Sequence, residues 1–193
     1  DEDELVARLR YLGAQGDLAA AELGYTDAVV GLLGHSSPEV VAAAAEALGS
    51  MGAAAAKHVD AVAGTLDSQS MKVRQAAAYA VGQFGEAGRK HGDRLVMLIQ
   101  EAGQGDEGEA AKVIALQALG QVGASSGAEV ASALLNDASP QVQAAACLAL
   151  GGLGEASAAG AVAAKLATEG TRCAAIHALA DLGPQASQPY ISD

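Results

Sequence analysis

Large aromatic side chains are scarce in this sequence. Its 193 residues include no tryptophan, one phenylalanine and four tyrosines, and much of its 51% hydrophobic content is alanine. Because alanine buries little apolar area, such a chain must bring its backbones close together and bury many small contacts. Alanine is also the strongest helix former, whereas strands favour β-branched and aromatic residues. The composition therefore predicts an all-α protein.

Basic residues are few as well. The chain has 11 Lys and Arg against 23 Asp and Glu, which gives a net charge of −12. Phosphate groups are bound by clustered Lys and Arg, so nucleic acid and anionic lipid are disfavoured as partners. An acidic surface suits a protein partner whose own surface is basic or neutral.

Long apolar runs and clustered cysteines are also missing. The longest uncharged run, residues 138–154, contains serine, proline and two glutamines, so no membrane insertion is expected. The opening DEDELVARLR does not have the pattern of a signal peptide. Cys147 and Cys173 have neither metal-type spacing nor positions suited to a disulfide, and we expect free thiols in an intracellular, cytoplasmic protein.

A short glycine pattern recurs along the chain. It appears as YLGAQG, ALGSMG, AVGQFG, ALGQVG and ALGGLG, and finally as ALADLG, in which Ala180 replaces the first glycine. The second glycines, near which the repeats end, stand at positions 16, 52, 85, 123, 154 and 183. This spacing indicates a repeat array, so residues 1–193 are predicted to form a single repeat domain.

Each unit is predicted to contain two helices, A and then B. Ser37 and Ser139 suit the N-cap of helix B, and Pro38 and Pro140 suit its first turn. The second glycine suits a left-handed C-cap, and the first allows a neighbouring helix to approach closely. Asp27, Asp60 and Asp93 are predicted to cap the shorter helix A. Helical spacing predicts one buried face of helix B, formed in one repeat by Val73, Ala76, Ala77, Ala80, Val81 and Phe84.

The B-helix segments SPEVVAAAAEALGSMG and SPQVQAAACLALGGLG, the pair Val73–Arg74 and the Ala-Leu-Gly-x-x-Gly ending resemble HEAT and HEAT-like repeats, including the short variety of phycobilisome lyases. The resemblance implies a right-handed α-solenoid of about five and a half helix pairs. Such arrays mostly bind other proteins and share no catalytic residues. The family's B-helix arginine is present as Arg74 and Arg172 and is Lys112 once. The chain opens on a B helix and ends where another A helix should begin, so we expect a fragment of a longer array.

The histidines of KHVD and KHGD, His58 and His91, allow two interpretations. With Asp60 and Asp93 they could form metal or acid–base sites. A motif that repeats with the structural period more often serves the structure, as a connection between repeats followed by a capping aspartate. We therefore predict no catalytic residue, metal site or cofactor.

The candidate binding site is a pair of columns on the B helices. The position three residues before the first glycine of each pair changes in every repeat, and the position one turn earlier includes Gln75. In a HEAT-like array these columns would face the concave side, where they would bind a partner or simply be solvated. Tyr79 and Arg10 are the expected anchors. The candidate residues are Arg10, Glu46, Gln75, Tyr79, Gln117, Leu148 and His177.

An acidic insertion, EAGQGDEGE, joins helix A to helix B in one repeat. Its acidic residues are Glu101, Asp106, Glu107 and Glu109. It is either a flexible, solvated loop or a contact for a basic partner.

The sequence thus predicts a non-enzymatic scaffold or adaptor, one subunit of a larger assembly, that binds a protein on its concave B-helix surface. One alternative is a phycobilin-lyase-like protein that handles a chromophore with Arg10, Glu46, Tyr79, Arg74 and His177. Another is a purely architectural spacer.

Overall fold

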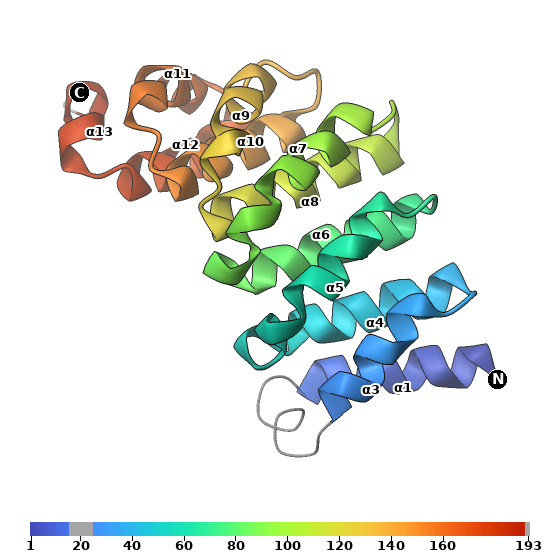
Figure 1. Cartoon of the computed structure of the whole chain (residues 1–193). Coiled ribbons are helices and arrows are strands. Elements are labelled where there is room, and N and C mark those ends of the chain that lie inside the picture. Colours follow the sequence, from blue (N-terminus) through green and yellow to red (C-terminus); the bar gives the residue numbers. More distant parts are fainter. Residues whose placement is uncertain (16–24, 192–193) are drawn as a thin grey trace.

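The computed structural model describes residues 1–15 and 25–191, which contain helices, turns and bends and no strand. The helices stack in a curved column that runs from α1 to α13 (Figure 1). Within the described part of the chain, no helix is both long and apolar enough to cross a membrane. The predicted all-α solenoid is confirmed.

Two layers of helices make up the column. Successive B helices pack on one another, and α13 takes the A position after α12, where it contacts α11 and α12. In the view of Figure 1 the A helices lie in front of the B helices. The B helices are α1 (Glu2–Gln15), α4 (Pro38–Ser50), α6 (Met71–Gln83), α8 (Asp106–Val122), α10 (Pro140–Leu153) and α12 (Glu169–Asp181). The A helices are α3 (Tyr25–Gly31), α5 (Val59–Gly64), α7 (Gly92–Glu101), α9 (Ala128–Leu134), α11 (Ala159–Ala164) and α13 (Pro184–Ile191). Short 3-10 helices join them at Leu32–Gly34, Gly52–His58, Thr65–Asp67, Gly85–His91, Ser125–Gly127, Ala156–Ala158 and Lys165–Ala167.

The B helices pack closely because a glycine of one faces an alanine of the next. A Cβ placed on Gly49 would lie only 2.7 Å from the Cα of Ala80. The same arrangement recurs between Gly151 and Ala178, where the distance would be 2.8 Å. The alanine-rich composition and the repeated first glycine therefore have one cause, the close approach of neighbouring backbones.

The ends of the B helices largely follow the prediction. Pro38 and Pro140 are the first helical residues of α4 and α10. The hydroxyl of Ser139 accepts a hydrogen bond from the N–H of Val142, whereas that of Ser37 donates to Glu39 instead. The second glycines have the positive φ of a left-handed C-cap, at Gly52, Gly85, Gly123, Gly154 and Gly183. The glycine at position 16 lies outside the described residues.

The aspartates of the A helices are not N-caps, and that prediction is wrong. The 3-10 helices Gly52–His58 and Gly85–His91 run directly into α5 and α7, so Asp60 and Asp93 fall inside the first helical turn. Asp27 likewise lies within α3. Because the backbone is already helical before each aspartate, its carboxylate is available for contacts with the following repeat.

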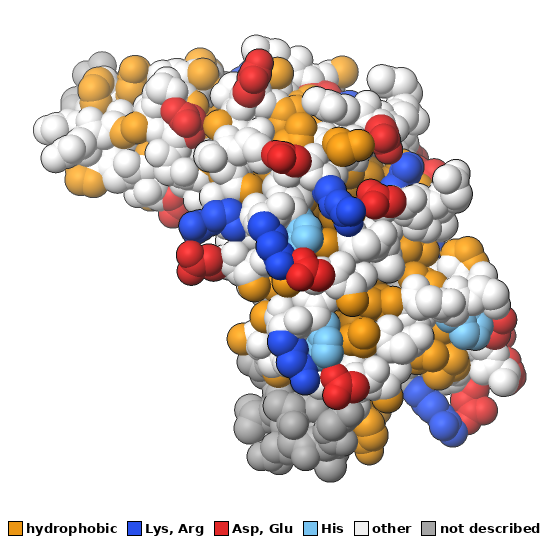
Figure 2. Space-filling model, viewed as in Figure 1, with side chains coloured by type: hydrophobic (Ala, Val, Ile, Leu, Met, Phe, Trp, Pro, Cys, Tyr) orange, Lys and Arg blue, Asp and Glu red, His pale blue; other side chains and the backbone are white. Residues whose placement is uncertain are grey.

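These contacts link successive repeats. The carboxylate of Asp27 lies 2.9 Å from His58 Nε2 and that of Asp60 lies 2.9 Å from His91 Nε2, each with a neighbouring lysine. Figure 2 shows both groups of basic, histidine and acidic side chains on the A-helix side. His58 and His91 thus join repeats, and each pairs with the aspartate of the preceding repeat rather than with the one that follows it in sequence.

The acidic insertion is mostly helical, so the predicted loop is shorter than expected. Glu101 is the last residue of α7, and α8 begins at Asp106 after Gly105, whose φ is 88°. Asp106, Glu107 and Glu109 occupy the first turn of α8, where the helix dipole favours acidic side chains. Only residues 102–105 connect the two helices.

Both cysteines are free thiols. Cys147 is buried in α10, and this burial raises its pKa to about 11, while Cys173 on α12 is exposed. The two residues lie on neighbouring B helices and form no disulfide, as their different columns predicted.

Candidate partner-binding face

The variable column of the B helices lies at the surface along the whole array. Each of its six residues is exposed, although the alanines and leucines that flank it are mostly buried. Gln75, one turn before Tyr79, is half-buried. We call this surface the B face; it carries Arg10, Glu46, Gln75, Tyr79, Gln117, Leu148 and His177.

Three hollows follow one another along the B face. The first lies between α1 and α4, with Arg10 and Glu46 on its rim. The second, of about 410 Å³, is lined from α4, α6 and α8 and includes Glu46 and Tyr79. The third is lined from α8, α10 and α12 and includes Gln117 and Leu148. The structure thus brings together neighbouring members of the predicted column, while His177 lies outside these hollows.

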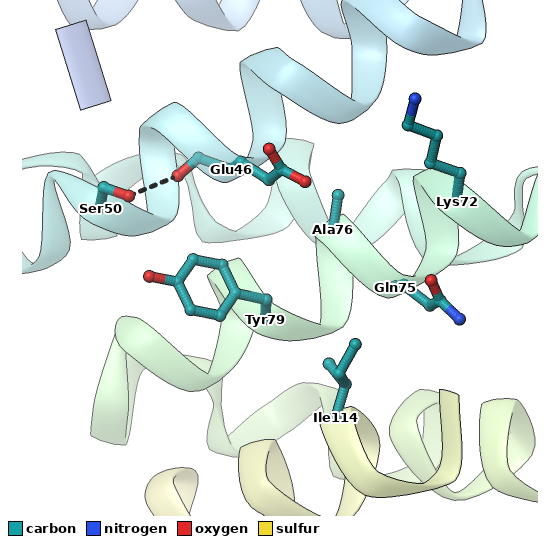
Figure 3. Close-up of a pocket in the computed structure, with 7 residues that line it drawn as sticks. All are labelled: Glu46, Ser50, Lys72, Gln75, Ala76, Tyr79 and Ile114. Atoms are coloured by element: carbon teal, nitrogen blue, oxygen red, sulfur yellow. Dashed lines mark hydrogen bonds between the residues drawn. The ribbon is translucent and has the colours of Figure 1, made fainter. Parts of the chain in front are cut away.

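The central hollow is shown in Figure 3, where Glu46 and Tyr79 project from α4 and α6 into the same space. The ring of Tyr79 lies against the backbone of α4, since a Cβ on Gly49 would come within 3.2 Å of its Cε1 atom. Gln75 is held in place, because its Nε2 donates to the carbonyl oxygen of Glu107 at 3.0 Å. The acidic turn of α8 therefore positions part of the B face.

Sequence reasoning did not include four of the residues that line this hollow, Ser50, Lys72, Ala76 and Ile114, among the candidate site residues. Lys72 and Ile114 line it beside Tyr79, but neither belongs to the two columns considered. Lys72 stands seven residues before Tyr79, which is two helical turns, and Ile114 stands three residues before Gln117. Helical spacing from the candidate residues would have found both.

The charges of the B face differ from those elsewhere in the array. Several carboxylates at the edges and on the A-helix side have basic partners, as in Asp27–His58, Asp60–His91, Asp67–Arg94, Glu101–Arg74 and Asp137–Lys112. By contrast, the side chains of Arg10, Glu46 and Lys72 form no hydrogen bond or ion pair with another described residue. Arg10 and Glu46 are thus open to a ligand, and Lys72 acts only electrostatically on the carboxylate of Glu39.

The pair Lys112–Asp137 is the most sheltered of these contacts. Its atoms lie 3.1 Å apart, and the two side chains are only 15% and 13% exposed. Burial alone would raise the pKa of Asp137, but hydrogen bonds from the N–H of Ser139 and from Lys112 outweigh it and hold this pKa below its ordinary value. The carboxylate therefore stabilises the fold in its charged form.

We expect Asp137→Asn to lower the free energy of unfolding by about 1 kcal/mol at pH 7, because a hydrogen-bonded charge is lost. The pKa of Asp137 is lower in the folded chain, so its contribution is complete above the unfolded-state value and is lost as pH falls through the folded-state value. Urea denaturation of both proteins between pH 7 and pH 3 should show the difference narrowing at the acid end. A constant difference at all pH values would contradict this account.

Comparisons with known proteins agree with this architecture. Residues 26–111 match the family model for HEAT repeats. The protein is an α-helical repeat solenoid that is similar to HEAT repeats over this stretch. No curated protein sequence matches the chain.

Solved structures extend the likeness to nearly the whole solenoid. A designed armadillo repeat protein is 21% identical with a TM-score of 0.71, and the match covers 95% of each chain. A designed armadillo repeat protein in complex with the peptide (KR)4 is 19% identical, with a TM-score of 0.70 over 92% of this chain and 91% of that one. The complex of CpcE and CpcF of phycocyanin lyase from Nostoc sp. is 21% identical, with a TM-score of 0.66 over 96% and 75%. At these identities the likeness concerns the fold.

Proposed function

We propose that this HEAT-like solenoid is a non-enzymatic scaffold that binds a protein partner along its B face, as an adaptor or as a subunit of a larger assembly. The observation that carries the proposal is the row of exposed, variable side chains over three successive hollows. Solenoids present binding surfaces in this way, with changeable residues on a regular framework. Because the framework is already ordered, little conformational entropy is lost on binding.

An extended segment of the partner fits this surface better than a compact one. The hollows follow the axis of the array, and each is lined from two or three neighbouring B helices. A solved structure of similar fold is a designed armadillo repeat protein in complex with the peptide (KR)4. The net charge of −12 favours a partner that is basic or neutral overall.

Replacing Tyr79 or Arg10 by alanine should weaken partner binding by about five- to thirtyfold, because aromatic and arginine side chains dominate binding energy at interfaces. Affinity capture followed by quantitative mass spectrometry would identify the partner, and calorimetry with the purified pair would measure the loss. Met97→Ala is the matched control, since Met97 is 52% exposed but lies on the A helix α7. Circular dichroism would verify that each variant keeps its helical content.

If both variants capture the same proteins in the same amounts as the unmodified chain, the B face is not the partner site. A loss with Met97→Ala instead would place the site on the A-helix side. If nothing specific is captured by any version, the architectural spacer becomes the better description.

The likeness to the phycocyanin lyase complex supports a second candidate, a protein that handles a bilin chromophore. Of the residues considered for it, Arg10, Glu46 and Tyr79 line neighbouring hollows. Arg74 pairs with Glu101 away from them. Mixing the purified protein with phycocyanobilin should then shift the absorbance spectrum of the bilin, and an unchanged spectrum would exclude this candidate.

A further inference from the structure

The basic side chains of this protein are almost all engaged within the molecule. Of its 11 Lys and Arg residues, only Arg10 and Lys72 have no hydrogen bond or ion pair to another described residue. The other nine donate to carboxylate, amide or carbonyl oxygens; they are Arg8, Lys57, Arg74, Arg89, Lys90, Arg94, Lys112, Lys165 and Arg172. Both line hollows of the B face, and the charge of Lys72 also acts on the nearby carboxylate of Glu39 on α4.

A free carboxylate lies between these two cations. Glu46 lines the first hollow together with Arg10 and the central hollow together with Lys72. Its side chain is exposed and unpaired among the described residues, and the ring of Tyr79 projects into the same hollow (Figure 3). The charges that line the first and central hollows are thus positive at Arg10, negative at Glu46 and positive at Lys72, which lies two helical turns before Tyr79 on α6.

Each charged group in these two hollows favours a particular kind of side chain in a bound peptide. A carboxylate beside an aromatic ring suits a Lys or Arg side chain, which can form an ion pair with one and a cation–π contact with the other. An ammonium or guanidinium group on either side suits Asp or Glu. A uniformly basic segment would instead place positive side chains beside Arg10 and Lys72.

We infer that the partner segment bound over α1, α4 and α6 is an extended peptide in which one Lys or Arg is flanked on both sides by Asp or Glu. This inference rests on the proposed function and specifies its partner. Packed helices lie about 8–10 Å apart, and an extended chain advances about 3.3 Å per residue. The acidic residue that meets Arg10 therefore stands two or three positions from the basic one. Lys72 lies two helical turns, about 10 Å, from the level of Tyr79 along α6, so the acidic residue that meets it stands about four positions from the basic one.

The test is a library of random 12-residue peptides displayed on phage and selected on the full chain. The enriched peptides should contain Asp or Glu two or three residues to one side of Lys or Arg and about four residues to the other side. A synthetic peptide of the enriched sequence should bind about two- to fivefold more weakly to Glu46→Gln, to Arg10→Gln and to Lys72→Gln, as expected for exposed ion pairs. Lys57→Gln, which changes a charge on the A-helix side, should leave its affinity unchanged.

A charge-reversed variant makes the test sharper. The triple change Arg10→Glu, Glu46→Lys and Lys72→Glu should select the inverse pattern, an acidic residue flanked by basic ones. If the selected peptides are uniformly basic or apolar and still lose binding to Tyr79→Ala, the charge pattern is wrong while the B face remains the binding site. If no peptide is enriched, or if binding is indifferent to Tyr79→Ala and to all three charge changes, both the pattern and the proposed function are contradicted.

Discussion

Replacing Leu150 by alanine is expected to lower the free energy of unfolding by about 2–5 kcal/mol, the largest effect of any single change considered. Leu150 is fully buried in α10, which packs between α8 and α12. Large side chains are few in this core, and the alanines around it cannot extend to fill the space left by a leucine. The cavity would therefore remain, and its cost adds to the lost burial.

Leu148→Ala on the same helix is the matched control. Leu148 is 38% exposed on the B face, so its removal should change stability by about 0.5 kcal/mol or less while weakening partner binding. Urea denaturation followed by circular dichroism would compare the two variants, provided that the slope of unfolding free energy against urea concentration stays the same. Equal losses of stability in both would show that α10 does not turn Leu150 toward the core.

Much of this core could be predicted from the sequence, because the stacking depends on short, repeated patterns. The first glycine of one repeat and the alanine two residues before the first glycine of the next form the contact between neighbouring B helices, as at Gly49 and Ala80. Both residues belong to the same recurring segment, so finding the segment also finds the contact. The exposed column can be predicted in the same way. Once the glycine and alanine of a B helix face the neighbouring B helices, helical geometry determines which of its other side chains point to solvent.

The contacts that were not predicted join residues about thirty positions apart and depend on the connections between helices. Asp60 was expected to cap its own helix, but the 3-10 helix before it leaves the carboxylate for Lys90 and His91 of the next repeat. The turn at Gly105 likewise brings Glu107 onto α8, where its carbonyl oxygen accepts from Gln75. An acidic residue near the start of a helix is favoured both as an N-cap and within the first turn. Local preference therefore does not determine whether its carboxylate binds its own helix or a side chain of the next repeat.

Gly49→Ala should be destabilising by about 1–3 kcal/mol, although alanine is normally the better residue inside a helix. The new methyl group would lie 2.7 Å from the Cα and 2.9 Å from the Cβ of Ala80, and it would press on the ring of Tyr79 at 3.2 Å. Backbone atoms cannot rotate away as a side chain can, so α4 and α6 must move apart. The separation would also loosen the contacts of the central hollow, and partner binding should weaken together with stability.

Gly64→Ala isolates the intrinsic preference of the helix from this packing effect. Gly64 ends α5 with φ of −58°, and a Cβ there would meet no atom within 4 Å. This substitution should therefore stabilise the protein by about 0.5–1 kcal/mol, the usual gain of alanine over glycine in a helix. Thermal and urea unfolding of the two variants should move in opposite directions from the unmodified chain. If Gly49→Ala were also stabilising, the recurring first glycine would owe its place to something other than the close approach of the B helices.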